Sequence, residues 1–169
     1  MPASPVRRRR RAAALATSGL MAASVLTLAV APSSLARTLT GTERADVLRG
    51  GDDDDVLRGR GGNDRLYGGD DNDRLHGGRG NDQLFGGDDS DRLYGDAGND
   101  RLVGGDDNDL LVGGAGRDLI LARDGDRDTV RCGPGRDRAV VDQFDRVSGC
   151  EVVQRAVVRG DDDDDDDDD

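Results

Sequence analysis

A nine-residue pattern of glycine, acidic and aliphatic positions runs without insertion from Gly41 to Leu121. The consecutive blocks read GTERADVLR, GGDDDDVLR, GRGGNDRLY, GGDDNDRLH, GGRGNDQLF, GGDDSDRLY, GDAGNDRLV, GGDDNDLLV and GGAGRDLIL. Each block begins with glycine, has aspartate at its sixth position and has a large aliphatic residue at its eighth. Glycines permit the positive φ angles and close backbone approach of tight loops. The pattern therefore predicts short strands, whose single aliphatic side chains fill a thin core between two sheets.

The fourth position of the blocks reveals a longer period. After the first block it alternates between aspartate and glycine, in the order Asp53, Gly62, Asp71, Gly80, Asp89, Gly98, Asp107, Gly116. A period of eighteen residues is expected if two blocks complete one circuit and successive loops fall on opposite edges of a solenoid. The sequence therefore predicts two chemically distinct edges, one of them richer in carboxylates.

These blocks resemble the RTX, or haemolysin-type, calcium-binding nonapeptide repeat, whose consensus is G-G-x-G-x-D-x-U-x with U a large aliphatic residue. The resemblance covers about half of the chain and recurs in register. It implies an all-β fold, a right-handed parallel β-roll solenoid in which each nonapeptide forms a turn and a short strand. It also implies that aspartates at the sixth position are the primary side-chain ligands of calcium, with loop carbonyl groups completing the coordination.

The expected repulsion between carboxylates of stacked loops also favours the binding of several Ca2+ ions. Neighbouring strands of a sheet lie about 4.8 Å apart, so stacked loops bring their carboxylates close enough to repel. A cation between loops n and n+2 removes that repulsion, and calcium accepts about six to eight oxygen ligands in a flexible geometry. Magnesium requires a tighter octahedron, and zinc prefers histidine and cysteine ligands, which the blocks do not supply as a set. Loop pairing predicts on the order of seven sites.

Two sets of aspartates are candidate metal ligands. Those at the sixth position are Asp46, Asp55, Asp64, Asp73, Asp82, Asp91, Asp100, Asp109 and Asp118, and those at the fourth are Asp53, Asp71, Asp89 and Asp107. The aspartates at the third position of the same blocks are as well explained as turn caps. Each block buries one large aliphatic side chain, and this stabilises the fold less than the ordering of nine residues costs in conformational entropy. We therefore expect the chain to be largely disordered without calcium and compact with it.

The amino-terminal segment has the three parts of a secretory signal peptide. Five arginines at 7–11 precede an apolar stretch at 12–30, and small residues precede a predicted cleavage site after Ala36. An uncleaved membrane anchor is the alternative, since nineteen mostly apolar residues are just long enough to span a bilayer. We expect cleavage, and hence a secreted, extracellular protein.

Composition bears on the partners. Charged residues make up 36% of the chain and aromatic residues 2%, which is typical of disorder unless a repeat imposes order. The net charge of −12 becomes about −17 once the five arginines are removed. Such a polyanion repels nucleic acids and anionic membranes, so we expect neither as a partner, and expect cations instead.

The carboxyl-terminal part contains both cysteines. Cys132 and Cys150 are expected to form a disulfide in an oxidising compartment. After Leu121 the register slips by one residue, and Asp128 and Asp137 mark decayed repeats. The predicted organisation is a signal peptide at 1–36, β-roll repeats at 37–131, a disulfide-tied cap at 132–159, and a disordered poly-aspartate tail at 160–169.

The sequence indicates a binding protein rather than an enzyme. Its single histidine, His76, lies within a block, and no nucleophile paired with a base is visible. We expect a monomeric calcium-binding protein with a structural, adhesive or cell-surface role, whose protein or glycan partner the sequence does not identify. The alternatives are an accessory module of a secreted enzyme or toxin, and an acidic polyanion that binds mineral or cations diffusely.

Overall fold

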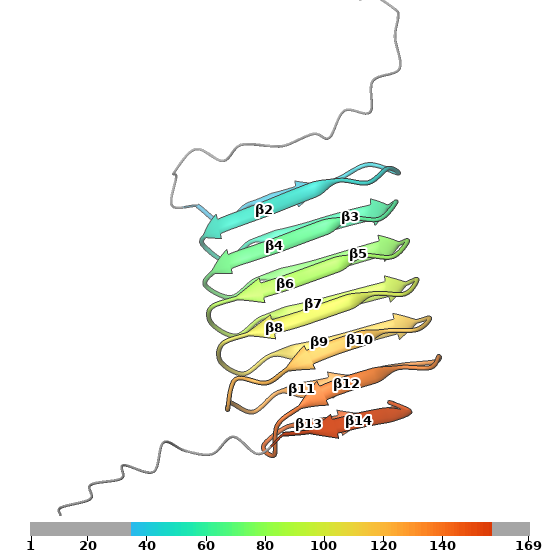
Figure 1. Ribbon diagram of the computed structural model, residues 1–169. Helices are drawn as coiled ribbons and strands as arrows, with labels where there is room; N and C mark the ends of the chain where they lie inside the picture. Colours follow the sequence, from blue (N-terminus) through green and yellow to red (C-terminus); the bar gives the residue numbers. More distant parts are fainter. Residues whose placement is uncertain (1–34, 157–169) are drawn as a thin grey trace, which may run out of the picture.

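The computed structural model describes residues 35–156, and these residues form a parallel β-solenoid without any helix (Figure 1). Accordingly, this part of the chain has no helix that could cross a membrane. The fourteen strands are β1 (Thr38–Thr40), β2 (Val47–Asp52), β3 (Val56–Gly61), β4 (Arg65–Asp70), β5 (Arg74–Arg79), β6 (Gln83–Gly87), β7 (Arg92–Ala97), β8 (Arg101–Gly105), β9 (Leu110–Ala115), β10 (Leu119–Ala122), β11 (Thr129–Arg131), β12 (Arg138–Val141), β13 (Arg146–Ser148) and β14 (Val152–Arg155).

Odd-numbered and even-numbered strands form two separate sheets of seven strands each. All neighbouring strands are parallel, and from β1 to β10 each residue pairs with the residue eighteen positions further along, as Leu48 does with Leu66. One coil therefore consists of two nonapeptides, one strand in each sheet, as the alternation at the fourth position predicts. The chain rises coil by coil, and loops line both edges (Figure 1).

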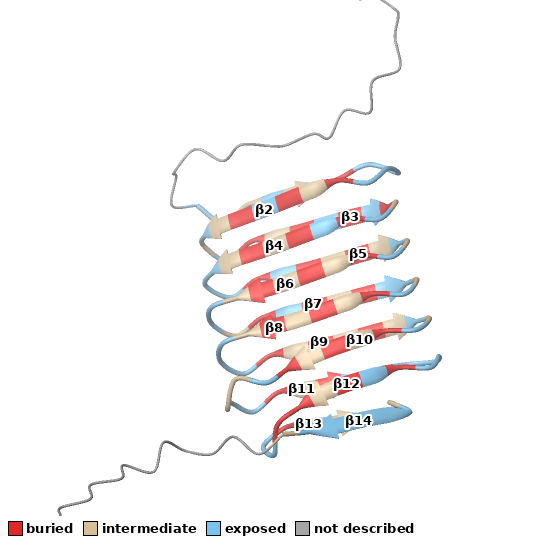
Figure 2. Ribbon diagram, viewed as in Figure 1, coloured by how far each residue is buried: buried red, intermediate tan, exposed pale blue. Residues whose placement is uncertain are grey.

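The core is a single layer of aliphatic side chains enclosed between the sheets. Buried positions, red in Figure 2, recur at the middle of the strands. The eighth residue of every block is buried, and from the second block onward none is measurably exposed. Strand residues on either side of it face outward and are exposed or half-buried, which is the alternation of a pleated strand. The members of this column are Leu48, Leu57, Leu66, Leu75, Leu84, Leu93, Leu102, Leu111 and Ile120, and Val130 and Ala139 extend it.

Both edges require left-handed backbone at the fourth position of the block. On one edge glycine supplies it, as at Gly98, whose φ is +139° and where a Cβ atom would collide with the carbonyl oxygen of Gly80 one coil earlier. On the other edge aspartate adopts it, with φ of +65° at Asp71, +67° at Asp89 and +70° at Asp107. Aspartate tolerates this region better than most residues. The two edges thus differ both in chemistry and in the φ angle of the fourth residue.

The regular period ends after β10. The pairing offset becomes nineteen residues between β9 and β11 and between β10 and β12, then seventeen between β11 and β13 and fourteen between β12 and β14. The strands nevertheless stay parallel and in the same two sheets. The segment predicted as a cap, over 132–159, is described as far as residue 156, and it ends the solenoid with β12, β13 and β14, which continue the two sheets.

The predicted disulfide between Cys132 and Cys150 is present. Cys132 follows β11 and is fully buried, and Cys150 lies between β13 and β14, so the bond joins two successive coils. The predicted tail at 160–169 lies outside the described residues, as does the predicted signal peptide at 1–36 apart from its last two residues.

Candidate metal sites along the two loop edges

The aspartates at the sixth position form two columns, one along each edge. Every one of them is buried, with at most 4% of its surface exposed. Asp46, Asp64, Asp82, Asp100 and Asp118 precede the even-numbered strands, whereas Asp55, Asp73, Asp91 and Asp109 precede the odd-numbered strands. The division into two columns agrees with the eighteen-residue period.

One carboxylate oxygen of each aspartate holds the stack together. Oδ1 of Asp82 accepts a hydrogen bond from the backbone amide of Asp64, one coil earlier, at 2.7 Å. The same bond recurs along both columns at 2.7–2.9 Å. It continues through the slip, where Oδ1 of Asp128 and Oδ1 of Asp137 accept the amides of Asp109 and Asp118. The Oδ1 atom of each of these aspartates therefore has a structural role, as the acceptor of an amide from the preceding coil.

The other oxygen, Oδ2, is buried without a hydrogen-bond partner in nearly every member of the columns. The aspartates with such an oxygen are Asp55, Asp64, Asp73, Asp82, Asp91, Asp100, Asp109 and Asp118, together with Asp128 and Asp137 in the decayed repeats. A buried carboxylate oxygen that lacks a partner is costly. A row of these oxygens at each edge is what a column of bound cations would satisfy.

Backbone carbonyl groups face the same spaces. At Gly113, the position that a Cβ atom would take lies 2.6 Å from Oδ2 of Asp118 and 2.6 Å from the carbonyl oxygen of Cys132 in the next coil. The corresponding point at Gly41 lies 2.7 Å from Oδ2 of Asp46 and 2.7 Å from the carbonyl oxygen of Gly59. Carboxylate and carbonyl oxygens gathered between successive coils are ligands of the kind that calcium prefers. The residues therefore fit calcium.

Burial raises the pKa of several aspartates in the two columns above the ordinary value of 3.8. The pKa rises to about 6 for Asp64, to about 7 for Asp73, Asp91 and Asp100, and to about 8 for Asp109. Loss of hydration on burial is the largest cause, and carboxylates of neighbouring coils add to it, while the amide hydrogen bond opposes both. Without metal, burial therefore disfavours the charged form of these five aspartates.

The first block departs from the others. Oδ2 of Asp46 accepts hydrogen bonds from the amide nitrogen of Thr42 at 2.5 Å and from its Oγ1 at 2.8 Å. Thr42 stands where most later blocks have a second glycine. Of the predicted ligands at the sixth position, Asp46 is thus the one whose Oδ2 is already satisfied by the protein, which agrees with a capping role for this block.

The aspartates at the fourth position are placed differently. Asp71, Asp89 and Asp107 are exposed on the loops, whereas Asp53 is half-buried and its Oδ2 has no partner. The positive φ angles of Asp71, Asp89 and Asp107 account for their presence as turn residues. Their role as calcium ligands stays a prediction.

Asparagines at the fifth position link the loops on the surface. The amide of Asn81 donates to Oδ1 of Asn63, and the amide of Asn99 donates to Oδ1 of Asn81, both at 2.8 Å. These side chains are exposed and saturate backbone donors, so they act as loop caps.

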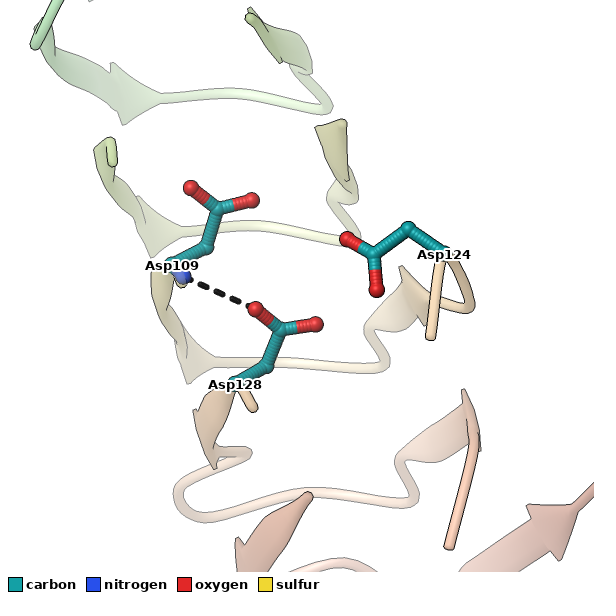
Figure 3. Close-up of side chains that lie close together, drawn as sticks. All are labelled: Asp109, Asp124 and Asp128. Atoms are coloured by element: carbon teal, nitrogen blue, oxygen red, sulfur yellow. Dashed lines mark hydrogen bonds between the residues drawn. The ribbon is translucent and has the colours of Figure 1, made fainter. Parts of the chain in front are cut away.

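Three acidic residues beyond Leu121 extend the candidate site and were missing from the predicted ligands. Asp128 and Asp137 continue the two columns. Each precedes an apolar residue by two positions, Val130 and Ala139, and that spacing is the signal that identifies them. Asp124 lies eighteen residues after Asp106, an aspartate at the third position of its block, and its proximity to Asp109 and Asp128 is visible only in three dimensions (Figure 3).

Comparison with known families agrees with this geometry. The family model of the RTX calcium-binding nonapeptide repeat matches the chain four times, at residues 40–75, 67–102, 94–127 and 103–138. The matches together span more than half of the chain and extend past the slip after Leu121. No curated protein matches it. The chain belongs to the RTX calcium-binding nonapeptide repeat family, whose repeats bind calcium in a β-roll.

Proposed function

We propose that this protein is a secreted calcium-binding module whose β-roll folds when calcium enters the two loop columns, and that its role is structural, adhesive or at a cell surface. The observation that carries the proposal is the row of buried, unpartnered Oδ2 atoms along both edges. These atoms lie between coils, so a cation held there contacts two coils at once and favours the stacked state over the open chain.

Folding and calcium binding depend on each other for a physical reason. In the open chain the carboxylates are hydrated and far apart, while in the roll they are buried in columns. Closing the roll without a cation removes hydration from many carboxylates and brings like charges together. A bound cation compensates for both costs, and because it binds well only to the folded arrangement, its binding free energy becomes folding free energy.

A non-catalytic role is supported by what the described residues do. His76 stacks on Tyr94, with ring centroids 4.6 Å apart, and its Nδ1 lies 3.4 Å from a carboxylate oxygen of Asp96. It therefore serves as one rung of a side-chain ladder on the outer face of a sheet. The buried aspartates at the sixth position lie in the loop columns, where their Oδ1 atoms accept backbone amides.

Circular dichroism of the purified protein, titrated with calcium and separately with magnesium at fixed ionic strength, tests the proposal. We expect a cooperative gain of β signal with calcium and little change with magnesium. A full β signal in the presence of chelator, or an equal response to both ions, would contradict calcium-dependent folding. Sequencing the amino terminus of the exported protein tests secretion, and cleavage after Ala36 is the expected result.

A further inference from the structure

The stretch from the start of β10 at Leu119 to the start of β11 at Thr129 is one residue longer than the equivalent stretch from β8 to β9. The offset from β9 to β11 is nineteen residues, whereas it is eighteen from β7 to β9. The additional length falls in the segment 123–128, and its effect is to bring Asp124 back toward the column (Figure 3).

Three carboxylates meet at this loop. Asp109, Asp124 and Asp128 each place one oxygen so that the three oxygens lie within 4.8 Å of one another. Within residues 35–156 this is the one group of three acidic, histidine or cysteine side chains with that proximity. In the regular coils the carboxylates of the loop also lie near the column, as Asp88 and Asp89 do for Asp91, but no three of them in the described residues come this close.

In each of these three carboxylates, one oxygen accepts a hydrogen bond and the other does not. Oδ1 of Asp109 and Oδ1 of Asp128 accept amides of the preceding coils, and Oδ1 of Asp124 accepts the amide of Asp126. Oδ2 of all three is buried and has no partner. Asp109 is 3% exposed and Asp128 is fully buried, so two of the unpartnered groups are inaccessible to bulk water.

Two further acidic residues nearby are not available as ligands in the same way. Oδ1 and Oδ2 of Asp142 accept the amides of Phe144 and Gly125. Oδ1 and Oδ2 of Asp145 accept the amides of Asp128 and Asp142. These two side chains hold the loops in place, and the unpartnered carboxylate oxygens remain on the other three residues.

We propose that Asp109, Asp124 and Asp128 form a three-carboxylate site for a hard cation, calcium in the first instance, which holds its ion more tightly than the regular two-carboxylate sites of the roll. The inference rests on the proposed calcium binding and adds a site that the repeat does not encode. A third negative charge strengthens attraction for the cation, because the number of charged ligands is a main determinant of calcium affinity.

A single reporter can be placed beside this site. The chain contains no tryptophan. Phe144 is 45% exposed, and together with Asn108, Gly125, Asp126 and Arg127 it lines a shallow groove against the loop. Phe144→Trp in the full chain therefore provides one indole next to the proposed site. Terbium is a hard trivalent cation, and its emission is sensitised by a nearby indole, so it reports occupancy there.

Asp124→Asn, introduced in the Phe144→Trp background, is the informative variant, because its side-chain oxygen can still accept the Asp126 amide while the charge is lost. Asp126→Asn is the matched control, since it removes one charge from an exposed residue of the same loop. We expect Asp124→Asn to raise the terbium concentration at half-saturation about tenfold or more, and Asp126→Asn to raise it less than about twofold. Calcium should displace terbium from the parent.

Other outcomes would overturn the inference. Equal shifts in the two variants would mean that general electrostatic attraction operates, and no shift in Asp124→Asn would mean that Asp124 is not a ligand. Absence of sensitised emission from a parent that gains β signal with calcium would place no ion at the loop and leave the proposed function intact. A parent that responds to neither ion would refute both. If Asp124→Asn fails to gain β signal at saturating calcium, Asp124→Ser, whose hydroxyl can accept the same amide, replaces it.

Discussion

The backbone amide of Asp64 donates to Oδ1 of Asp82 across one full coil, at 2.7 Å, while Oδ2 of Asp82 is left buried without a partner. One carboxylate thus has two separable functions. Its first oxygen fixes the spacing of adjacent coils through a backbone donor, and its second is available to a cation. Asparagine retains an acceptor for the amide but has no negative charge, so substitution separates the two functions.

Asp91→Asn is expected to raise the calcium concentration at the folding midpoint about tenfold, because one charged ligand is lost between two coils while the bond from the Asp73 amide is kept. The matched control is Asp88→Asn, an exposed residue of the same loop, which should shift the midpoint far less. Calcium titration followed by circular dichroism measures both. Equal midpoints for the two variants would argue against ligation by the sixth position.

In calcium-free solution, lower pH should favour the roll. The pKa of these aspartates rises from 3.8 to about 7 for Asp73, Asp91 and Asp100 and to about 8 for Asp109 on folding. The folded state therefore binds more protons than the open chain. The contribution of these protons to stability is fully present below pH 3.8 and is lost as the pH rises through about 7 to 8.

We expect metal-depleted protein to gain β signal as the pH is lowered from 8 toward 5, as protons neutralise the columns in place of calcium. Calcium must compete with those protons, so the calcium concentration at the folding midpoint should rise over the same interval. Circular dichroism with and without calcium measures both trends, and sedimentation checks that the acid form stays monomeric. A metal-free β signal that grows with increasing pH would contradict the assignment.

Leu84→Ala should destabilise the calcium-loaded roll by about 2–5 kcal/mol, because the side chain is fully buried in the single core layer and its removal leaves a cavity between the sheets. Leu39→Ala in β1 is the control, since that side chain is partly buried at the end of the column. Chemical denaturation at saturating calcium compares the two. A loss at Leu39 as large as that at Leu84 would indicate that the core does not end at β1.

Removing the disulfide should weaken the last coils selectively. Replacing both Cys132 and Cys150 by serine releases a constraint on a segment of eighteen residues, which is worth about 3 kcal/mol in the chain-entropy estimate. We expect faster amide exchange in β11 through β14 while β4 through β8 are unchanged at saturating calcium. Reduction of the unaltered protein should reproduce the effect. Uniformly faster exchange would show that the solenoid unfolds as one unit.

The regular coils could be predicted because their sequence is locally redundant. Period, strand position, the buried aliphatic column and the two aspartate columns each follow from residues at fixed spacing, as with Leu66 and Asp64. The pairing of Cys132 with Cys150 was also predicted and is confirmed. In the regular coils, the residue eighteen positions along the chain is the neighbour in the next coil, so the repeat itself identifies the contacts.

The irregular coils could be predicted less well, because insertions and deletions change the pairing offset to nineteen, seventeen and fourteen residues. Asp128 and Asp137 keep a local signature, since each precedes an apolar residue by two positions. The proximity of Asp124 to Asp109 and Asp128 depends on the path of the loop at 123–128, which sequence spacing does not describe. Glu151 is a further case: its Oε2 accepts the amide of Asp137, the place that aspartate takes elsewhere in the stack.

Because of the eighteen-residue register, successive regular coils of this protein stack on one another in the same way. The upper and lower surfaces of each regular coil carry the same donors, acceptors and apolar side chain, so a coil can be inserted or removed with no new complementary surface to evolve. Tandem duplication within the gene then changes physical length and ion capacity together, in fixed proportion. Length in such a molecule is a heritable quantity, on which selection can act one coil at a time.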